Sequence, residues 1–545
     1  MDAGPNERST LLAKHPRTLK HVRTGSGEHL SDMASDASVS SLVESSTNYQ
    51  GSVETMASIT SSDLDEFNWR RIRFYLVEPM VFILLFAYSL SDTILKNQVI
   101  YQTCTTIFFF NETDCRQLGT KNASEHVRDI ETTIQPFAAK ILMTSTVIES
   151  FVPALCGIFI GTWSDRFGRK PLLVIGYSGY ALYYALAAII AQLSTTRPVS
   201  PWYYLLAVVP YSLFGGSVTY SVATLCYISD VSSAQERPYR MATYEAALFI
   251  GLMSGSFLSG YLYEYTNATF VFLTSCSCIF VAVCITVFFI PESLNRRRFN
   301  FIENLHVNVS SDLAASLNVE SNQFRKLFDL AAVKEMWRTC FKPRECNDRA
   351  IIWLASFAQM STFFVIYGSM AVFYLFIRET FHWTIKEFNT FETLNIFLSL
   401  MGNIMGVIIL RRIFKLSIVS LGLLALLSES TGCFLRAFAD TNWLLYLSIG
   451  VSALRSMGNP MCRTIISNIL PPNELGKFFT FQGVLQAFLP FFASPIYTGI
   501  YSLTLTTFPG FYNLLSANLI LLAICYLLII LRKKRAFPVH YQQRF

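Results

Sequence analysis

The feature that most constrains this chain is a series of apolar runs, each about as long as a membrane-spanning helix. About twenty apolar residues cross the hydrocarbon core of a bilayer as a helix. The runs are continuously apolar, without alternation of period two, so they predict helices and not the strands of a barrel. Twelve spans are expected, at about Val77–Val99, Phe137–Gly161, Leu172–Gln192, Trp202–Ile228, Ala242–Tyr263, Phe270–Ile290, Ile351–Phe376, Phe391–Leu410, Leu416–Phe438, Trp443–Leu470, Phe479–Leu503 and Phe511–Leu531.

Composition and charge agree with a membrane protein. Hydrophobic residues make up 52% of the chain and charged residues only 15%, whereas a soluble domain carries about 25% charge. A long polar stretch divides the twelve runs into two sets of six, the organisation of carriers that rock one half against the other. The sequence therefore predicts an all-α membrane protein with a disordered cytoplasmic tail (1–73), a first six-helix half (74–291), a cytoplasmic central loop (292–348), a second half (349–532) and a cytoplasmic tail (533–545).

Lysine and arginine gather at alternate ends of the runs, for example at Arg166, Arg169 and Lys170 after the second run and at 532–535 after the last. Because cytoplasmic loops carry the excess of these residues, both termini are expected in the cytoplasm. The net charge of +6 follows from this topology and gives no reason to expect a nucleic-acid partner. Within the central loop, Gln323–Cys340 fits an amphipathic helix at the membrane surface or a linker with chance periodicity.

The first external loop carries signs of exposure to an oxidising compartment. Asn111 and Asn122 begin N-glycosylation sequons, N-E-T and N-A-S. Cys104 and Cys115 are the two cysteines expected outside the membrane on this side, so they are candidates for a local disulfide. The remaining cysteines have no histidine partner on the spans, and neither a metal nor a cofactor is expected.

The N-terminal tail contains a short sorting pattern. Glu7, Leu11 and Leu12 fit the acidic dileucine form E-x-x-x-L-L, which adaptor proteins read for endosomal and lysosomal delivery. Six-residue patterns also arise by chance. The sequence therefore predicts a multi-pass protein of either the plasma membrane or the endolysosomal membrane, with adaptor proteins as possible partners at the tail.

Charged residues inside the spans are candidates for function, because each costs roughly 2.5–3.5 kcal/mol at mid-depth. No histidine falls in a span, so a proton-driven carrier would need a carboxylate, and a desolvated glutamate can hold a proton near neutral pH. Glu245 is the first candidate, with permanent pairing to Arg240 as the structural alternative, and Glu149 is the second. Candidates for binding an anionic substrate or holding a gate are Arg463, Arg455 and Glu429.

The segment Gly161–Pro171 joins the second and third runs and reads G-T-W-S-D-R-F-G-R-K-P. It combines the carboxylate of Asp165 with cations such as Arg166 and Arg169, and Gly168 permits a left-handed turn. A basic loop that only sets topology is the simpler interpretation. The spacing G-x-x-x-D-R-x-G-R-K, however, is similar to the signature loop between helices 2 and 3 of the major facilitator superfamily. This resemblance implies a secondary transporter.

A narrower resemblance covers about Val77 to Arg532. Val77-Glu78-Pro79, the W-S-D form of the signature loop, Tyr227–Ala246 and Pro460–Gly476 are similar to the proton-coupled folate transporter family. The resemblance implies the following roles: Glu245 couples protons, Asp230 is the helix 4 aspartate, Arg463 is the helix 10 arginine, and Asp165 and Arg169 form the gating pair.

Two departures separate this chain from the folate-transporting member. The histidines of that member around helix 7 have no counterpart in Ile351–Phe376, and Arg378–Asn389 lacks the cysteine that would bond to the first loop. Other members look like lysosomal or peptidoglycan-fragment carriers. The predicted function is therefore proton-coupled symport of a small organic anion, folate-like or muropeptide-like, with protons and membrane lipid as partners.

Two alternatives stay open at this point. Pro291-Glu292-Ser293 after the sixth run is shared with sugar porters, which favours a facilitative sugar or metabolite carrier. A receptor or scaffold with a transporter fold but no flux is the alternative from another class. An enzyme is not expected, because the chain shows no nucleophile–base pair and no phosphate-cradling motif.

Overall fold

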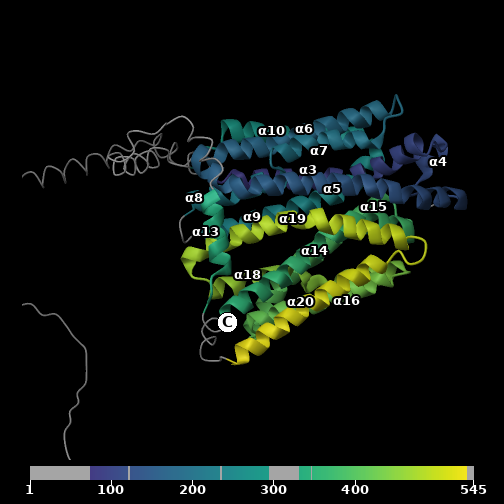
Figure 1. Cartoon of the computed structure of the whole chain (residues 1–545). Coiled ribbons are helices and arrows are strands. Elements are labelled where there is room, and N and C mark those ends of the chain that lie inside the picture. Colours follow the sequence, from purple (N-terminus) through teal and green to yellow (C-terminus); the bar gives the residue numbers. More distant parts are fainter. Residues whose placement is uncertain (1–73, 121–122, 233–235, 294–329, 345–346, 537–545) are drawn as a thin grey trace, which may run out of the picture. The chain divides into compact units, whose positions relative to one another are not determined.

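The computed structural model describes residues 74–536, apart from 121–122, 233–235, 294–329 and 345–346 (Figure 1). The predicted tail 1–73, the sorting residues Glu7, Leu11 and Leu12, and the sequon residue Asn122 lie outside the described residues. All regular secondary structure in the described part is helical. This confirms the predicted all-α fold.

Eleven helical segments of the described part are long and apolar enough to cross a membrane, each at a predicted span. Their helices are α3 (Val77–Gln102), α5 (Glu125–Phe167), α6 (Arg169–Ser194), α7 (Tyr204–Leu213) with α8 (Gly216–Val231), α9 (Arg237–Tyr265), α10 (Ala268–Phe288), α14 (Asp348–Phe381), α15 (Ile385–Val407), α16 (Ile418–Ala437), α19 (Pro472–Thr504) and α20 (Phe511–Ala536).

The tenth predicted span, Trp443–Leu470, is not one continuous helix. It consists of α17 (Asn442–Val451), the 3-10 turn η4 (Ala453–Met457) and α18 (Gly458–Ile469). Pro460 lies in the first turn of α18, where its missing N–H costs nothing, so α18 begins afresh there.

The fourth span is interrupted in a similar way, between α7 and α8. Gly215 and Gly216 have φ of 80° and 51°, in the left-handed region that favours glycine. A Cβ on Gly216 would lie 2.8 Å from Cγ of Pro153 in α5, so a side chain at this position would also clash.

Small residues let the helices of each half approach closely. In the first half, α3 packs against α9 and α10, and α6 packs against α10, α7 and α8. A Cβ on Gly251 or Gly255 of α9 would lie 2.8 or 2.4 Å from a carbonyl oxygen of α3, so these backbones nearly touch. In the second half, α14 packs against α18, α19 and α20, and α16 packs against α17, α18 and α20.

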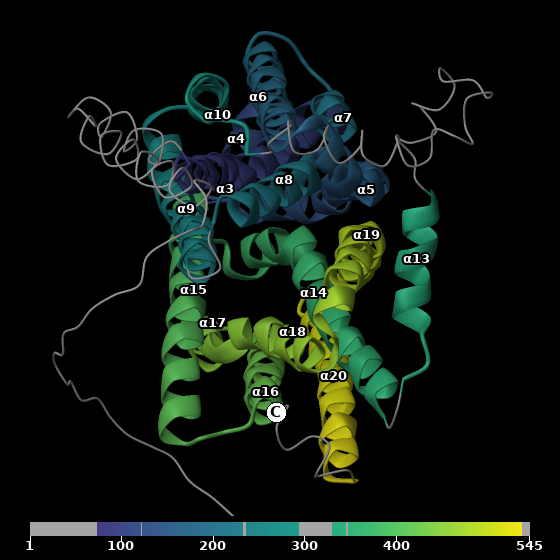
Figure 2. The ribbon, with the colours of Figure 1, turned by 90° about the vertical axis from the view of Figure 1, so that its left-hand side faces the viewer.

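The two halves meet along two helix pairs, which Figure 2 shows on opposite sides of the bundle. Helix α5 packs against α19 and, less extensively, α14, while α9 packs against α15. The space between these pairs is where groups of both halves can meet. We call the two ends of the bundle the disulfide end, at Cys104–Cys115, and the signature end, at Gly168.

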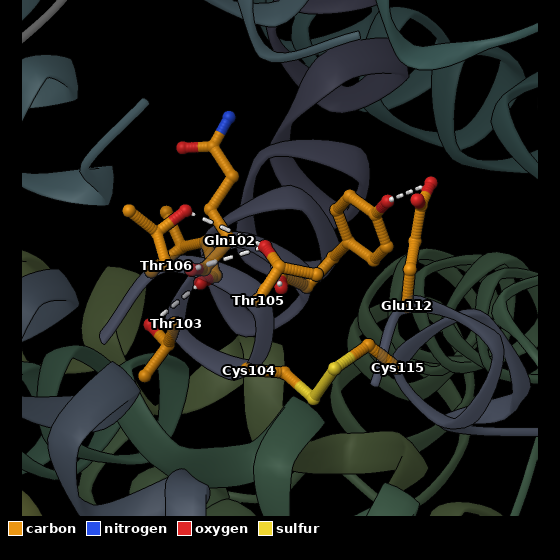
Figure 3. The surroundings of a disulfide bond; sticks show 9 residues. Gln102, Thr103, Cys104, Thr105, Thr106, Glu112 and Cys115 are labelled. Carbon is orange, nitrogen blue, oxygen red and sulfur yellow. Dashed lines mark hydrogen bonds between the residues drawn. A yellow bond between two sulfur atoms is a disulfide. The ribbon is translucent and has the colours of Figure 1, made fainter. Parts of the chain in front are cut away.

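The disulfide end is more helical than the external loop that was expected between the first two spans. Helix α3 continues into the π-helix η1 (Thr103–Ile107), α4 covers Glu112–Gln117, and α5 already begins at Glu125. Ser124 caps α5, its Oγ accepting from the amide of Val127 at 3.3 Å. Cys104 and Cys115 form a disulfide with Cα atoms 5.8 Å apart, which ties α4 to η1 (Figure 3).

Part of the central loop forms the helix α13 (Leu330–Phe341), which packs against α19. The ring centroid of Trp337 lies 5.8 Å from that of Phe481, and Phe341 lies 5.0 Å from Trp353. The amphipathic helix expected at Gln323–Cys340 is thus present from Leu330, and its earlier residues lie outside the described part.

Candidate functional site between the two halves

Glu245 faces the space between the halves. It lies two turns into α9, next to the buried Tyr244, and its own side chain is exposed. Its carboxylate interacts electrostatically with Arg463, which is exposed on α18 in the other half. Because these residues belong to different halves and attract each other, they face the space between the halves rather than lipid.

Polar aromatic side chains surround this pair. Tyr367 of α14 lies within electrostatic range of Arg463 and accepts a hydrogen bond from Gln486 of α19 at 3.3 Å. Tyr220 of α8 lies near Tyr367 from the opposite half. We call Tyr220, Glu245, Tyr367, Arg463 and Gln486 the central cluster. It offers one carboxylate, one guanidinium, two phenols and an amide, which suits an organic anion with hydrogen-bonding groups.

Two members of the central cluster come from the interrupted spans. Tyr220 is in α8, just after the Gly215–Gly216 break, and Arg463 is in α18, just after η4. These are the fourth spans of their halves. Interruptions at corresponding positions of two repeated halves are a mark of substrate sites in secondary transporters. The position of the breaks therefore supports the assignment of the central cluster.

Glu149 lies apart from the central cluster, within the first half. Its Oε1 accepts a hydrogen bond from Ser145 at 3.0 Å, and it interacts with Asp92 and Lys96 of α3. Asp92 and Lys96 form an ion pair with Oδ2 and Nζ 2.7 Å apart. Tyrosines including Tyr183 lie within electrostatic range of Glu149 and Asp92.

Arg455 and Glu429 form a second charged group, inside the second half. Glu429 of α16 is 4% exposed, and its Oε2 has no hydrogen-bond partner in the described part of the chain. It interacts with Arg455 of η4 and Arg436 of α16. The structure therefore brings Arg455 and Glu429 together but places Arg463 with Glu245, so the three predicted substrate or gate residues fall into two places.

The signature segment Gly161–Pro171 is almost entirely helical and turns at a single residue. Helix α5 continues to Phe167 and α6 begins at Arg169, which leaves Gly168 alone as the turn, with φ 104°. A Cβ on Gly168 would also lie 2.3 Å from Oε2 of Glu292. Glycine is therefore required at this position both by the backbone dihedral and by the lack of space for a side chain. The side chains of Asp165 and Arg166 lie outside the described part.

Arg169 links three segments of the first half. Its Nε donates to Oδ2 of Asp230 at the end of α8, at 2.8 Å, and its Nη1 donates to Ser164 at 2.5 Å. Glu292, after α10, accepts from the backbone amides of Arg169 and Lys170 at 2.9 and 3.2 Å. Glu292 thus caps α6 with a carboxylate, as the helix dipole favours. The capping role of Glu292 was not predicted from the sequence, although the pattern P-E-S after the sixth run contains this residue.

Arg240 pairs with Glu78, not with Glu245, which removes the structural alternative for Glu245. Arg240 Nε lies 2.7 Å from Oε1 of Glu78, and both side chains are 4% exposed. Arg240 also donates to the carbonyl of Phe74 at 2.6 Å. The pair fastens the start of α3 to α9 at the signature end.

We expect Glu78→Ala to be strongly destabilising, because it leaves the guanidinium of Arg240 buried without a counter-charge. Removing one partner of a buried ion pair costs about 3–5 kcal/mol of unfolding free energy. Thermal unfolding of purified protein should show a large loss for Glu78→Ala and recovery in the double variant Glu78→Gln, Arg240→Met. Equal losses in the single and double variants would contradict this account.

Comparison with known proteins supports the class of molecule. The sequence profile of the Major Facilitator Superfamily matches residues 80–495. A Drosophila melanogaster protein named "Probable peptidoglycan muropeptide transporter SLC46" is 41% identical over 476 residues, 86% of this chain and 88% of that protein. The "Proton-coupled folate transporter" of Rattus norvegicus is 23% identical over 446 residues, 82% of this chain and 89% of that protein.

A solved structure shows the same fold. The human organic anion transporter MFSD10 (TETRAN) superposes with a TM-score of 0.54 at 16% identity, covering 84% of this chain and 99% of that one. Two helical halves with charged groups facing the space between them define a membrane transporter. This chain belongs to the Major Facilitator Superfamily, in its SLC46 branch. The predicted resemblance to the proton-coupled folate transporter family is confirmed.

Proposed function

We propose that this chain is a proton-coupled symporter of a small organic anion of the muropeptide kind, with Glu245 binding the proton and Arg463 the anion. The observation that carries the proposal is the placement of one carboxylate and one guanidinium on opposite halves, facing the same space. The names of two relatives, a probable muropeptide transporter and a proton-coupled transporter, support the substrate and the driving ion respectively.

Proton and substrate binding are coupled because Arg463 can pair either with Glu245 or with an anionic substrate. Arg463 attracts Glu245 in the substrate-free protein, and a bound carboxylate would compete for the same guanidinium. Once the substrate occupies Arg463, an ionised Glu245 would have no counter-charge, so it takes up a proton. Anion and proton binding therefore favour each other, and this reciprocal free energy is the coupling.

The described conformation corresponds to the release step. Cross-half contacts such as Thr93 with Asn389, at 2.9 Å, close the disulfide end. Glu245 and Arg463 remain exposed, so proton and anion leave toward the signature end. We assign the signature end to the cytoplasm because of its arginines and lysines, and the disulfide end to the exterior or an organelle lumen, where disulfides persist.

Glycosylation and location extend this assignment. Asn111 is exposed at the disulfide end, directly before α4, so its side chain is accessible for an attached glycan. We propose the plasma membrane or the endolysosomal membrane as the location.

The phenols of the central cluster fit a muropeptide. Such a molecule combines sugar rings, amides and carboxylates. Tyr367 is half-buried and offers an aromatic face for a sugar ring together with a hydroxyl group, and Gln486 offers an amide, while Tyr220 is buried. Helix α14 has no histidine in the described structure, unlike the histidine-bearing helix 7 implied for a folate carrier.

We expect cells that express the chain to take up a labelled muropeptide faster at external pH 5.5 than at pH 7.5, by about tenfold or more, because a proton enters with each anion. Uptake should be measured against equal amounts of surface protein, with labelled folate and a labelled neutral sugar beside it. Faster uptake of the sugar than of the muropeptide, or muropeptide uptake that does not depend on pH, would contradict the proposal.

A further inference from the structure

Arg378 lies at the centre of the closed disulfide end. This arginine, in the last turn of α14, is 2% exposed. Its Nε donates to Oε1 of Glu131 on α5, and its Nη1 donates to Oδ1 of Asn97 on α3. The backbone amide of Gly119, which follows α4, donates to the other oxygen of Glu131 at 3.3 Å. Helices α3 and α5 of the first half therefore bind the side chain of Arg378 in the second half, and the segment after α4 supports Glu131.

The neighbouring residue, Glu379, adds a second carboxylate to this contact. Its Oε1 accepts from Oγ1 of Thr132 at 2.8 Å, and its Oε2 accepts from Nε2 of Gln135 at 2.9 Å. Gln135 is fully buried and accepts in turn from Tyr501 of α19 at 2.9 Å. Glu131 and Glu379 thus lie beside each other when the end is closed, and their charges repel.

The charges at this contact do not balance. Two carboxylates, Glu131 and Glu379, face the single guanidinium of Arg378. The phenols that surround them carry no charge at physiological pH; they are Tyr374 on α14, Tyr263 on α9, Tyr101 on α3 and Tyr501 on α19.

The other charged groups described at this end do not restore the balance. Arg116, which lines the same pocket as Arg378, pairs with Glu112 within α4. Burial, and then the neighbouring Arg128, lower the pKa of His382, just after α14, which disfavours its charged form. Arg128 is exposed on α5, where water screens it. Lys386 of α15 and Glu264 of α9, 2.8 Å apart, cancel each other. Among the described groups around Arg378, closure therefore removes one excess negative charge from water.

We propose that Glu379 is a proton-binding site of the disulfide-end gate: the gate closes with a proton on Glu379 and releases it on opening. Two carboxylates that are forced together cannot both remain ionised without cost, and Arg378 pairs with Glu131, so Glu379 holds the proton. When the halves part, Thr132 and Gln135 leave Glu379, water replaces them, and Glu379 ionises. Acid on this side thus favours closure.

This site regulates the cycle and carries no net proton, since it takes up and returns its proton on the same side. The inference rests on alternating access, as the proposed function does, but not on Glu245. Glu245 exchanges its proton with both sides, whereas Glu379 biases the direction in which the halves turn. The two roles can therefore be separated by experiment.

The test measures the distance between the halves at this end. Thr196, after α6, and Asp440, after α16, are exposed and outside the gate. Spin labels on Thr196→Cys and Asp440→Cys, in purified full-length protein in lipid nanodiscs, report gate opening by pulsed electron paramagnetic resonance. The protein without these two cysteines gives the background. The closed population should rise as the pH falls from 8 to 5.

Variants assign this dependence to one residue. Glu379→Gln, which mimics the protonated form, should stay closed across the range. Glu245→Gln should keep the pH response, as should Glu112→Gln, which removes an exposed carboxylate of the same end that pairs with Arg116 within α4. If the distance in the wild-type protein does not change with pH, the proposal is wrong, whether or not the variants fold. Retention of the full response in Glu379→Gln, or its loss in Glu112→Gln, would also overturn it.

Discussion

Glu245→Gln should abolish uptake driven by an inward proton gradient, with a loss of at least about a hundredfold, while exchange of substrate across the membrane survives. Glutamine keeps the shape of the side chain and its hydrogen bonding, but it cannot bind and release a proton. Arg463 still binds the anion, so exchange, which needs no net proton movement, continues. Uptake and counterflow in proteoliposomes with imposed pH gradients measure the two processes separately.

The control for this variant lies on the same helix. Glu264→Gln also removes a carboxylate from α9, but from an exposed pair with Lys386 at the disulfide end. It should leave gradient-driven uptake near the wild-type level. If Glu245→Gln retained gradient-driven uptake, Glu245 would be structural. Glu149 and Glu429, with their separate charged surroundings, would then be the groups to test.

Arg169→Ala should reduce transport by about tenfold or more without loss of folded protein, because it removes the charge that joins the signature turn to α8. Among the described residues, Asp230 would keep the weaker contact with Ser293, at 3.2 Å. The first half must move as one body when the halves rock, and this side chain ties α5, α6 and α8 together at the signature end. Transport rates, normalised to surface protein, should be compared with thermal unfolding.

Lys170→Ala provides the matched control for the signature turn. Lys170 is the next residue, and its Nζ donates to the carbonyl of Val287 at an exposed position. Loss of this cation should change transport little. Equal defects in both variants would mean that the turn acts through its net positive charge, and normal transport in Arg169→Ala would reduce the segment to a determinant of topology.

The interrupted helices show where prediction from hydropathy stops. A sliding window records only how apolar a run is, and Trp443–Leu470 is apolar enough despite Arg455 and Arg463. The chain nevertheless breaks around η4, and it breaks again at Gly215 and Gly216. The glycines and Pro460 were visible in the sequence, but glycine is common in continuous membrane helices too. Only packing decides which of them ends a helix.

The sequence by itself determined the fold class, and it predicted the two-half organisation and made Glu245 the leading candidate for a proton carrier. These follow from local properties: the length of apolar runs is fixed by bilayer thickness, and an ionisable residue within a run is conspicuous because it is costly. The signature spacing and the segment around Glu245 are likewise contiguous in the chain. Such features need no knowledge of neighbours in space.

The tertiary structure decided which charged residues pair with one another. It paired Arg240 with Glu78, 162 positions away, and Arg378 with Glu131, 247 positions away, and it separated Arg455 from Arg463 although they lie on one predicted span. The physical reason is that a buried charge is stabilised by whichever opposite charge the packing of helices brings within a few ångströms. Hydropathy and spacing along one helix carry no information about that choice.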